Sequence, residues 1–462
     1  MSKGKRQHPL AIFIKALEYS KNFIAPLIFI VGIDVFSGNF SGFSMYYIIA
    51  PVVTILLLLG VGAIQWFFFT YSYYDEVLII KKGMILKKER TIKKNRIQTI
   101  NLEAGLLLRI FKLTKVNVET AGGLAESELS IEAITKDDAY TLKALLEDES
   151  SVPDEEIEQG YTVDAQRLFL AGLTSGSVGI VMAVTFAFAS QFIALLPDDF
   201  YIQLASLGVI ALIGAFLMFT IFSWVVSIVK YVLSYAFYTI TKDQEEFNIK
   251  RGLIKQKHLS LKAHRIQAIT MIEGLLRQPF NYMTIEVDVA GGVQYKDGSK
   301  TVTHPLIHQS ELNGYYDYAF HDYSVSDSLK PLPKRARKRY FIRATLPFFI
   351  FIPLFIIFPF TLFILIGWLL NLVLAYFRYK DAGYEVNEDQ LTFRFRRIAR
   401  TTMITKKQYI QSVNIRQSLF QQFFGLATIE IHVLSSPSST AYSVKDVTIE
   451  EAIKIYQWVK PL

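Results

Sequence analysis

Four long windows of the chain carry no charged side chain, and they constrain its fold more than any other feature. The windows are 35–74, 168–197, 200–229 and 344–377. A helix needs roughly 20 apolar residues to cross a bilayer core about 30 Å thick. Because a soluble core helix is seldom apolar on every side over such a length, these windows predict membrane-spanning helices.

We expect six spanning helices, arranged as three hairpins. Asp34 should lie near the outer interface, because a carboxylate in mid-bilayer is costly. The last window suits a tight hairpin better than one long helix, because both of its flanks are basic. The predicted helices lie near 22–37 and 45–71, near 168–196 and 200–229, and in two limbs of 344–377 that meet near Pro359.

Basic residues predict which side of the membrane the remaining segments occupy. Lys3, Lys5 and Arg6 precede the first helix, and a lysine-rich stretch, 81–96, follows the second. The short connectors within the hairpins have no positive charge. Since Lys and Arg favour the cytoplasmic face, both termini and all long segments are predicted to be cytoplasmic. No cleavable signal peptide is expected.

Composition excludes several classes of protein. The chain is 52% hydrophobic and only 19% charged, whereas soluble domains carry about 25% charged residues. An ordinary soluble enzyme and a disordered chain are therefore excluded. Cysteine is absent, which excludes disulfides, thiolate zinc sites and thiol catalysis. In a membrane protein the net charge of +8 reflects the side on which the loops lie, so we expect no nucleic-acid partner.

An internal repeat follows the second and the fourth predicted helices. The two copies match without a gap at a constant offset of 169 residues. The matched points are Gly83 and Gly252, Arg96-Ile97-Gln98 and Arg265-Ile266-Gln267, Gly105 and Gly274, Phe111 and Phe280, and Ala121-Gly122-Gly123 and Ala290-Gly291-Gly292. A third, decayed copy follows the last window. It keeps Ile410-Gln411 and Phe424 but has Arg396 in place of the turn glycine.

Each copy is predicted to be mainly β. Residues 79–85 suggest two strands joined by a tight glycine turn. Alternation of apolar and polar residues over 116–120 and 285–289 indicates half-buried antiparallel strands. The apolar stretches 106–111 and 275–280 favour helix, and helical patterns over 137–147, 310–320 and 449–459 close the copies. The paired glycines Gly122-Gly123 and Gly291-Gly292 are interpreted as turns.

These motifs resemble the bacterial pleckstrin-homology (PH) domains of the second family. The resemblance covers nearly the whole chain, and the layout of three such domains, each behind a membrane hairpin, resembles a family of bacterial membrane proteins. It implies a bent antiparallel sheet capped by one C-terminal helix and a location in the bacterial cytoplasmic membrane. It also implies a partner, a smaller membrane relative with a single PH domain. It supplies no established activity.

The repeat and the windows together predict the domain organisation. The fold class is a membrane protein with six transmembrane α-helices and three cytoplasmic PH-like β-rich domains. The predicted segments are 1–74 with the first hairpin, 75–150 as the first PH-like domain, 151–166 as an acidic linker, 167–236 as the second hairpin, 237–322 as the second domain, 323–339 as a basic linker, 340–379 as the third hairpin, and 380–462 as a degenerate third domain.

The sequence predicts no enzyme, cofactor or metal site. Phosphate-binding loops, nucleophile elbows and kinase motifs are absent. Glu119 and Asp288 occupy equivalent positions on the polar side of their strands, which indicates a solvated sheet face. His258 and His264 lie in a lysine-rich stretch and are also expected to be solvated.

Basic clusters remain as candidate sites for anionic inner-leaflet lipid or a protein partner. The candidates are Lys81, Lys82, Lys87, Lys88, Arg96, Lys250, Arg251, Lys255, Arg265, Arg394, Arg396 and Arg397. The positive-inside rule alone also explains basic residues here, and the two interpretations are left open. We expect a non-enzymatic membrane scaffold or adaptor. The alternative is a transporter or a component of an export or envelope-defence complex.

Overall fold

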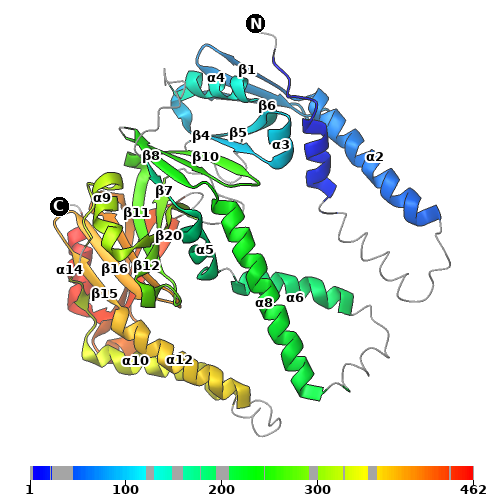
Figure 1. Cartoon of the computed structure of the whole chain (residues 1–462). Coiled ribbons are helices and arrows are strands. Elements are labelled where there is room, and N and C mark those ends of the chain that lie inside the picture. The colour runs from blue at the N-terminus through cyan, green and yellow to red at the C-terminus, as the bar shows by residue number, and fades with distance from the viewer. Residues whose placement is uncertain are drawn as a thin grey trace. The chain divides into compact units, whose positions relative to one another are not determined.

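The computed structural model describes most of the chain, which is shown in Figure 1. It describes residues 4–20, 22, 45–120, 129–147, 160–176, 178–193, 206, 208–243, 245–290, 300–325, 328–351, 362–435 and 439–460. The chain forms two compact units, each described by itself. The first contains Met1–Thr241 and Asn248–Ser260, and the second contains Lys242–Phe247 and Leu261–Leu462.

The first copy of the repeat folds as one three-stranded antiparallel sheet, three further antiparallel strands that belong to a larger sheet, and a closing helix. A short helix, α3 (Leu106–Ile110), joins the fourth strand to the fifth, and α4 (Lys136–Glu147) ends the copy. Both helices and the alternating strand at 116–120 confirm the sequence prediction. The strands are β1 (Thr70–Tyr74), β2 (Val77–Lys82), β3 (Lys88–Lys93), β4 (Ile97–Ala104), β5 (Leu113–Thr120) and β6 (Leu129–Thr135).

The second and third copies repeat this order. In the second copy the stretch predicted as helical forms only the 3-10 turn η3 (Gln278–Phe280), with Pro279 inside it. The second copy contains β8 (Thr239–Asp243), β9 (Glu246–Arg251), β10 (Gln256–Lys262), β11 (Ile266–Glu273), β12 (Tyr282–Val289), β13 (Thr301–His308) and α9 (Leu312–Ala319). The third contains β15 (Gly383–Val386), β16 (Gln390–Arg396), β17 (Arg400–Lys406), β18 (Ile410–Arg416), α13 (Leu419–Phe423), β19 (Leu426–Leu434), β20 (Ser439–Thr448) and α14 (Ile449–Val459).

Two sheets run across the boundaries between copies. One has the order β6-β5-β4-β10-β9-β8-β7 and the other β13-β12-β11-β17-β16-β15-β14, where β7 is Tyr161–Thr162 and β14 is Lys330–Pro331. The seam between β4 and β10 pairs Leu102 with His258. The seam between β11 and β17 is longer and extends from Ala268↔Thr405 to Glu273↔Arg400. Each seam supplies an edge strand with a neighbour, which removes an exposed edge.

The cores lie between the sheets and the closing helix. In the first copy Leu78 and Ile80 of β2 meet Val116 and Val118 of β5 and Leu142 of α4. In the third copy the apolar side chains of β16–β20 pack with Ile455 of α14. Since alternate strand residues point to one side, the period-two pattern places these residues inside. The β-rich, helix-capped part of the fold prediction is therefore confirmed.

The prediction of six membrane-spanning helices in three hairpins is wrong for the described residues. Among them, only Ile213–Tyr235 is long and apolar enough to cross a membrane, with a mean hydropathy of 2.0. It forms most of α8 (Gly208–Tyr235). A shorter apolar helix, Pro51–Phe67, lies within α2 (Met45–Phe67). The predicted helix 22–37 beyond residue 22, Asp34, and the turn near Pro359 lie outside the described residues.

Local sequence explains why two of the apolar windows do not form one continuous helix each. Around Ser175 the second window divides into α5 (Ala165–Leu173) and α6, which is described from Val178 to Ile193. In the fourth window α10 (Lys334–Thr345) ends just before Pro347, and the chain continues as the 3-10 segment η5 (Leu346–Phe351). A proline inside a helix removes a backbone donor and clashes with the preceding turn. Helix α12 (Leu362–Asp381) ends in a charged turn.

Candidate functional site

Three β-hairpin tips carry apolar side chains between basic ones. In the first copy the β2–β3 tip, defined as Gly83–Lys87, exposes Ile85 by 89% and Leu86 by 76%. The basic residues around it are exposed and are Lys81, Lys82, Lys87 and Lys88. Of these, Lys81 forms an exposed ion pair with Glu89 at 3.1 Å. Apolar residues exposed together and bordered by cations are typical of a surface that meets an anionic membrane.

The second and third copies have a similar tip. The β9–β10 tip, Gly252–Lys255, exposes Leu253 by 40% and Ile254 by 43% between Lys250 and Lys255. The β16–β17 tip, Arg397–Ala399, exposes Ile398 by 60%. The cations at these positions were predicted from the sequence as candidate site residues, but the apolar residues were not. The signal was present as Met84-Ile85-Leu86 between two lysine pairs.

Glycine is required at two of the tips. Gly83 and Gly252 have φ values of +101° and +103°, a region that L side chains rarely adopt. A Cβ atom at Gly83 would lie 2.1 Å from the carbonyl oxygen of Leu86, and one at Gly252 would lie 2.1 Å from that of Lys255. The predicted glycine turn is confirmed, although the second strand begins later than predicted, at Lys88.

The β9–β10 tip caps the end of α8. The backbone N–H of Gly252 donates to Ala236 O at 2.7 Å, and that of Leu253 donates to Leu233 O at 2.9 Å. The last carbonyls of a helix lack intrahelical partners, so these bonds satisfy them. The Arg251 guanidinium lies 4.6 Å from the centre of the Tyr235 ring. The tip is therefore fixed to the C-terminal end of the one described helix that is long and apolar enough to cross a membrane.

The third copy attaches its tip to α12 in another way. Arg378 in the last turn of α12 donates from Nε to Arg397 O at 2.9 Å. Arg396 is buried, pairs with Asp381 at 2.5 Å and donates to Gln278 Oε1 at 2.7 Å. Its side chain is thus used inside the fold, whereas Arg397 is exposed.

The other predicted basic residues are more dispersed. Arg96 is exposed, Arg265 and Arg394 are half-buried, and Arg394 donates to Thr402 Oγ1 at 3.0 Å. Among the described residues the structure therefore brings together the tip cations of each copy but does not join these three arginines to them.

The repeat signature has mainly a structural place. Ile266 and Gln267 are buried at the start of β11. The Gln267 carbonyl accepts a hydrogen bond from Thr405 Oγ1 at 2.6 Å, across the β11–β17 seam. Ile97 packs against the core of the first copy. The glycines 122, 123, 291 and 292 and the side chain of Gln98 lie outside the described residues.

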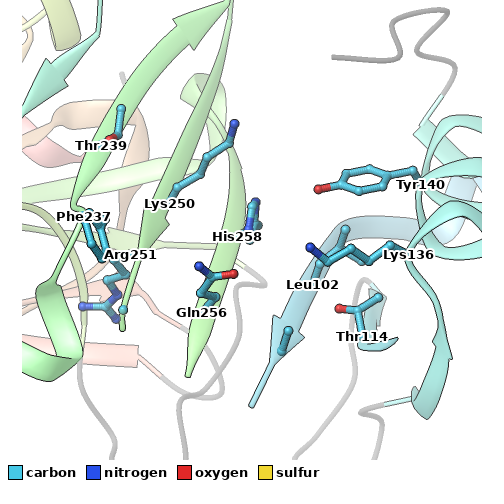
Figure 2. A pocket seen from close by; sticks show the side chains of 12 residues that line it. Leu102, Thr114, Lys136, Tyr140, Phe237, Thr239, Lys250, Arg251, Gln256 and His258 are labelled. Carbon is cyan, nitrogen blue, oxygen red and sulfur yellow. The ribbon is translucent and has the colours of Figure 1, made fainter. Parts of the chain in front are cut away.

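A cationic pocket lies beside the β4–β10 seam in the first unit and is shown in Figure 2. Lys136 and Tyr140 come from α4, and Lys250 and Arg251 come from β9. His258 and Gln256 of β10 complete the polar lining. Burial and the charges of Lys250, Lys136 and Lys143 lower the pKa of His258 to about 4. His258 was predicted to be solvated, but it is half-buried, whereas His264 is exposed.

Asp288 is also placed differently from the prediction. Its side chain is fully buried and pairs with Lys300 at 2.8 Å. It also accepts hydrogen bonds from Tyr442 Oη and, at 3.3 Å, from Thr440 Oγ1. The polar side of β12 is thus covered by β20 of the third copy instead of water. The side chain of Glu119 lies outside the described residues.

Comparison with known proteins agrees with this architecture. The family model of the bacterial PH domain matches residues 24–150, 181–318 and 345–462. The chain therefore belongs to the bacterial PH-domain family, as the resemblance predicted. It is 32% identical over 493 aligned residues to the "UPF0699 transmembrane protein YdbT" of Bacillus subtilis (strain 168), which covers 99% of this chain and 98% of that protein. This likeness and the helix Ile213–Tyr235 support membrane association.

Proposed function

We propose that the protein is a non-enzymatic membrane scaffold whose hairpin tips lie in the anionic surface of the bacterial cytoplasmic membrane. The β9–β10 tip carries this proposal, because hydrogen bonds fix it to the end of α8. If α8 crosses the bilayer, Leu253 and Ile254 lie at the membrane–water interface. The cations beside them support a cytoplasmic position for this end of α8.

The energetics favour attachment through several tips together. Each Lys or Arg close to an anionic leaflet contributes about 1 kcal/mol. Burial of apolar area adds about 25 cal/mol per Å². One tip with two or three apolar residues binds weakly, but copies on one chain act together. The remaining surfaces of the PH-like domains are then available for protein partners, among which we propose a smaller membrane relative with a single PH domain.

Lipid contact at the tips can be tested by fluorescence quenching, because the chain has no native cysteine. Single variants Ile85→Cys and Ile254→Cys are labelled in nanodiscs that contain phosphatidylglycerol and a quencher-bearing lipid. We expect strong quenching at both positions, and weaker quenching when phosphatidylcholine replaces phosphatidylglycerol.

The matched control is Thr141→Cys on α4, which is exposed but belongs to no tip and should not be quenched. Equal quenching at residues 85, 254 and 141, or none at 85 and 254, would show that the tips do not enter the membrane surface.

A further inference from the structure

The pocket beside the β4–β10 seam is a cavity whose charged lining residues are all cations. Its volume is about 280 Å³, close to the lower end of the range for small-molecule sites, about 300–1,000 Å³. In Figure 2, Lys136 and Tyr140 point across the cavity toward the strand that carries Gln256 and His258. The two walls come from different copies of the repeat and meet at the pair Leu102↔His258.

The charges of the lining residues indicate whether the pocket favours an anionic or a cationic ligand. Three cations, Lys136, Lys250 and Arg251, line the cavity, and its lining includes no Asp or Glu. Among the residues that the structure describes, no ion pair joins Lys136 or Lys250 to a carboxylate. The nearby Glu103 is paired with Lys255 at 2.6 Å. Two lysines that have no carboxylate partner among the described residues and line the same cavity favour an anion.

The neutral residues supply hydrogen-bond donors. Gln256 has an amide, Tyr140 and Thr239 have hydroxyls, and His258 has an imidazole. Charge-assisted hydrogen bonds to phosphate oxygens are stronger than neutral ones. Lys136 and Lys250 are exposed, so the mouth is open to an incoming ion.

We propose that this pocket is a binding site for a phosphate-bearing anion, held by Lys136 and Lys250 and by donors from Tyr140, Gln256 and His258. The phosphate is either a free ion or the headgroup of a lipid. The pocket shares Lys250 and Gly252 with the β9–β10 tip, but the apolar residues Leu253 and Ile254 are not part of its lining, so anion binding does not require these apolar residues to enter the membrane.

The surroundings of His258 couple this binding to protons. The groups that face it are Lys250 of β9 and Lys136 and Lys143 of α4, and with burial they lower its pKa to about 4. Without a bound anion, the His258 imidazole is therefore neutral at pH 7. A bound anion offsets the charge of these lysines and raises the pKa of His258. Binding then takes up a proton, and the affinity rises as the pH falls.

The test uses the full chain in phosphatidylcholine nanodiscs, titrated with inorganic phosphate by calorimetry. A second arm compares the melting temperature in discs that contain phosphatidic acid, phosphatidylglycerol or neither. We expect Lys136→Gln to weaken phosphate binding about tenfold, because a charged hydrogen bond is lost. Lys93→Gln, an exposed lysine of β3, removes the same charge outside the pocket and should have little effect.

The proton coupling is measured with sulfate, which keeps its charge throughout the pH range used. The parent should bind sulfate more tightly at pH 5.5 than at pH 7.5, and His258→Gln should flatten this dependence. Stabilisation by phosphatidic acid alone, lost in Lys136→Gln, would identify a lipid headgroup as the ligand.

Three results would overturn the proposal: no binding in either arm, equal binding by the parent and Lys136→Gln, or the same pH dependence in His258→Gln. A tip variant, Ile254→Asp, should keep phosphate binding. Failure of the membrane-contact proposal, seen by quenching, and failure of the anion-site proposal, seen by titration, are therefore distinguishable.

Discussion

Glu286 and Asp288 are two carboxylates on the same side of β12 that meet different surroundings. Asp288 is fully buried and paired with Lys300. Glu286 is half-buried, and burial raises its pKa to about 7, although the charge of Lys300 partly opposes this rise. A buried carboxyl without a full set of partners prefers its neutral form, so in the folded chain Glu286 keeps most of its proton at pH values below about 7.

This raised pKa predicts that Glu286 makes the fold less stable as the pH rises. Between the unfolded pKa of 4.5 and the folded pKa of about 7, the folded state binds a proton that the unfolded state has lost. Stability therefore falls across this range. The Glu286→Gln variant should match the parent near pH 5 and exceed it by about 1–3 kcal/mol at pH 8. Thermal unfolding in detergent at several pH values measures the difference, and parallel profiles would contradict it.

The sequence pattern predicted the side of β12 to which Asp288 points but not what covers that side. Alternation indicates which residues share a face, and Ile285 and Val287 are indeed in the core. The cover on the other face is Tyr442, more than 150 residues later in the chain. A pattern confined to one strand contains no information about such a distant partner.

The β9–β10 tip shows how one turn can determine the end of a long helix. Gly252 has a positive φ, and its N–H caps the end of α8. The same turn directs Leu253 and Ile254 outward. This one turn thus joins β9 to β10, caps α8 and exposes the two apolar residues of the proposed membrane contact.

Substitution at this turn should be costly. In Gly252→Ala the Cβ atom would lie 2.1 Å from Lys255 O, so the turn must change shape. We expect a loss of roughly 2 kcal/mol or more, since strain at a positive φ adds to the clash. Gly214→Ala is the control, because Gly214 lies within α8 with open space around it. That change should be neutral or slightly stabilising. Equal melting temperatures for both variants would refute this account of the turn.

Local chemistry also explains which elements were predictable. The glycine turns, β5, β12, α4 and α14 follow from residue type and periodicity alone. The apolar windows were misleading because length and composition do not show where a helix breaks. Ser175 and Pro347 lie at two of these breaks. The pocket was not predictable, because Lys136 and His258 become neighbours only through the β4–β10 seam.

The repeat predicted three similar modules, and the family match confirms them. It did not predict that β11 takes its outer neighbour from the next copy, as the six-residue register with β17 shows. Sequence similarity reveals copies, whereas edge-to-edge pairing depends on which strands lack a partner.

This seam can be tested by crosslinking in the cysteine-free chain. Ile272 pairs with Thr401 in the β11–β17 register, and paired antiparallel residues lie about 4.5–5.5 Å apart at Cα. That spacing suits a disulfide. The pair Ile272→Cys/Thr401→Cys should oxidise readily, as a mobility shift on non-reducing gels shows. Ile272→Cys/Thr402→Cys should not, because adjacent strand residues point to opposite faces. The reverse preference would show that the register is wrong.

The sheets shared between copies limit how this chain can be shortened. A fragment that stops at residue 322 would lose β17, and β11 would then present a bare row of amide and carbonyl groups. Such a row invites another chain to bind and favours aggregates. The first copy also has the separate three-stranded sheet β1-β2-β3, and the third copy has the separate sheet β18-β19-β20. A viable deletion must therefore remove one complete repeat period. The fourth strand of one remaining copy can then pair with the third strand of the next copy, as β4 pairs with β10 and β11 with β17.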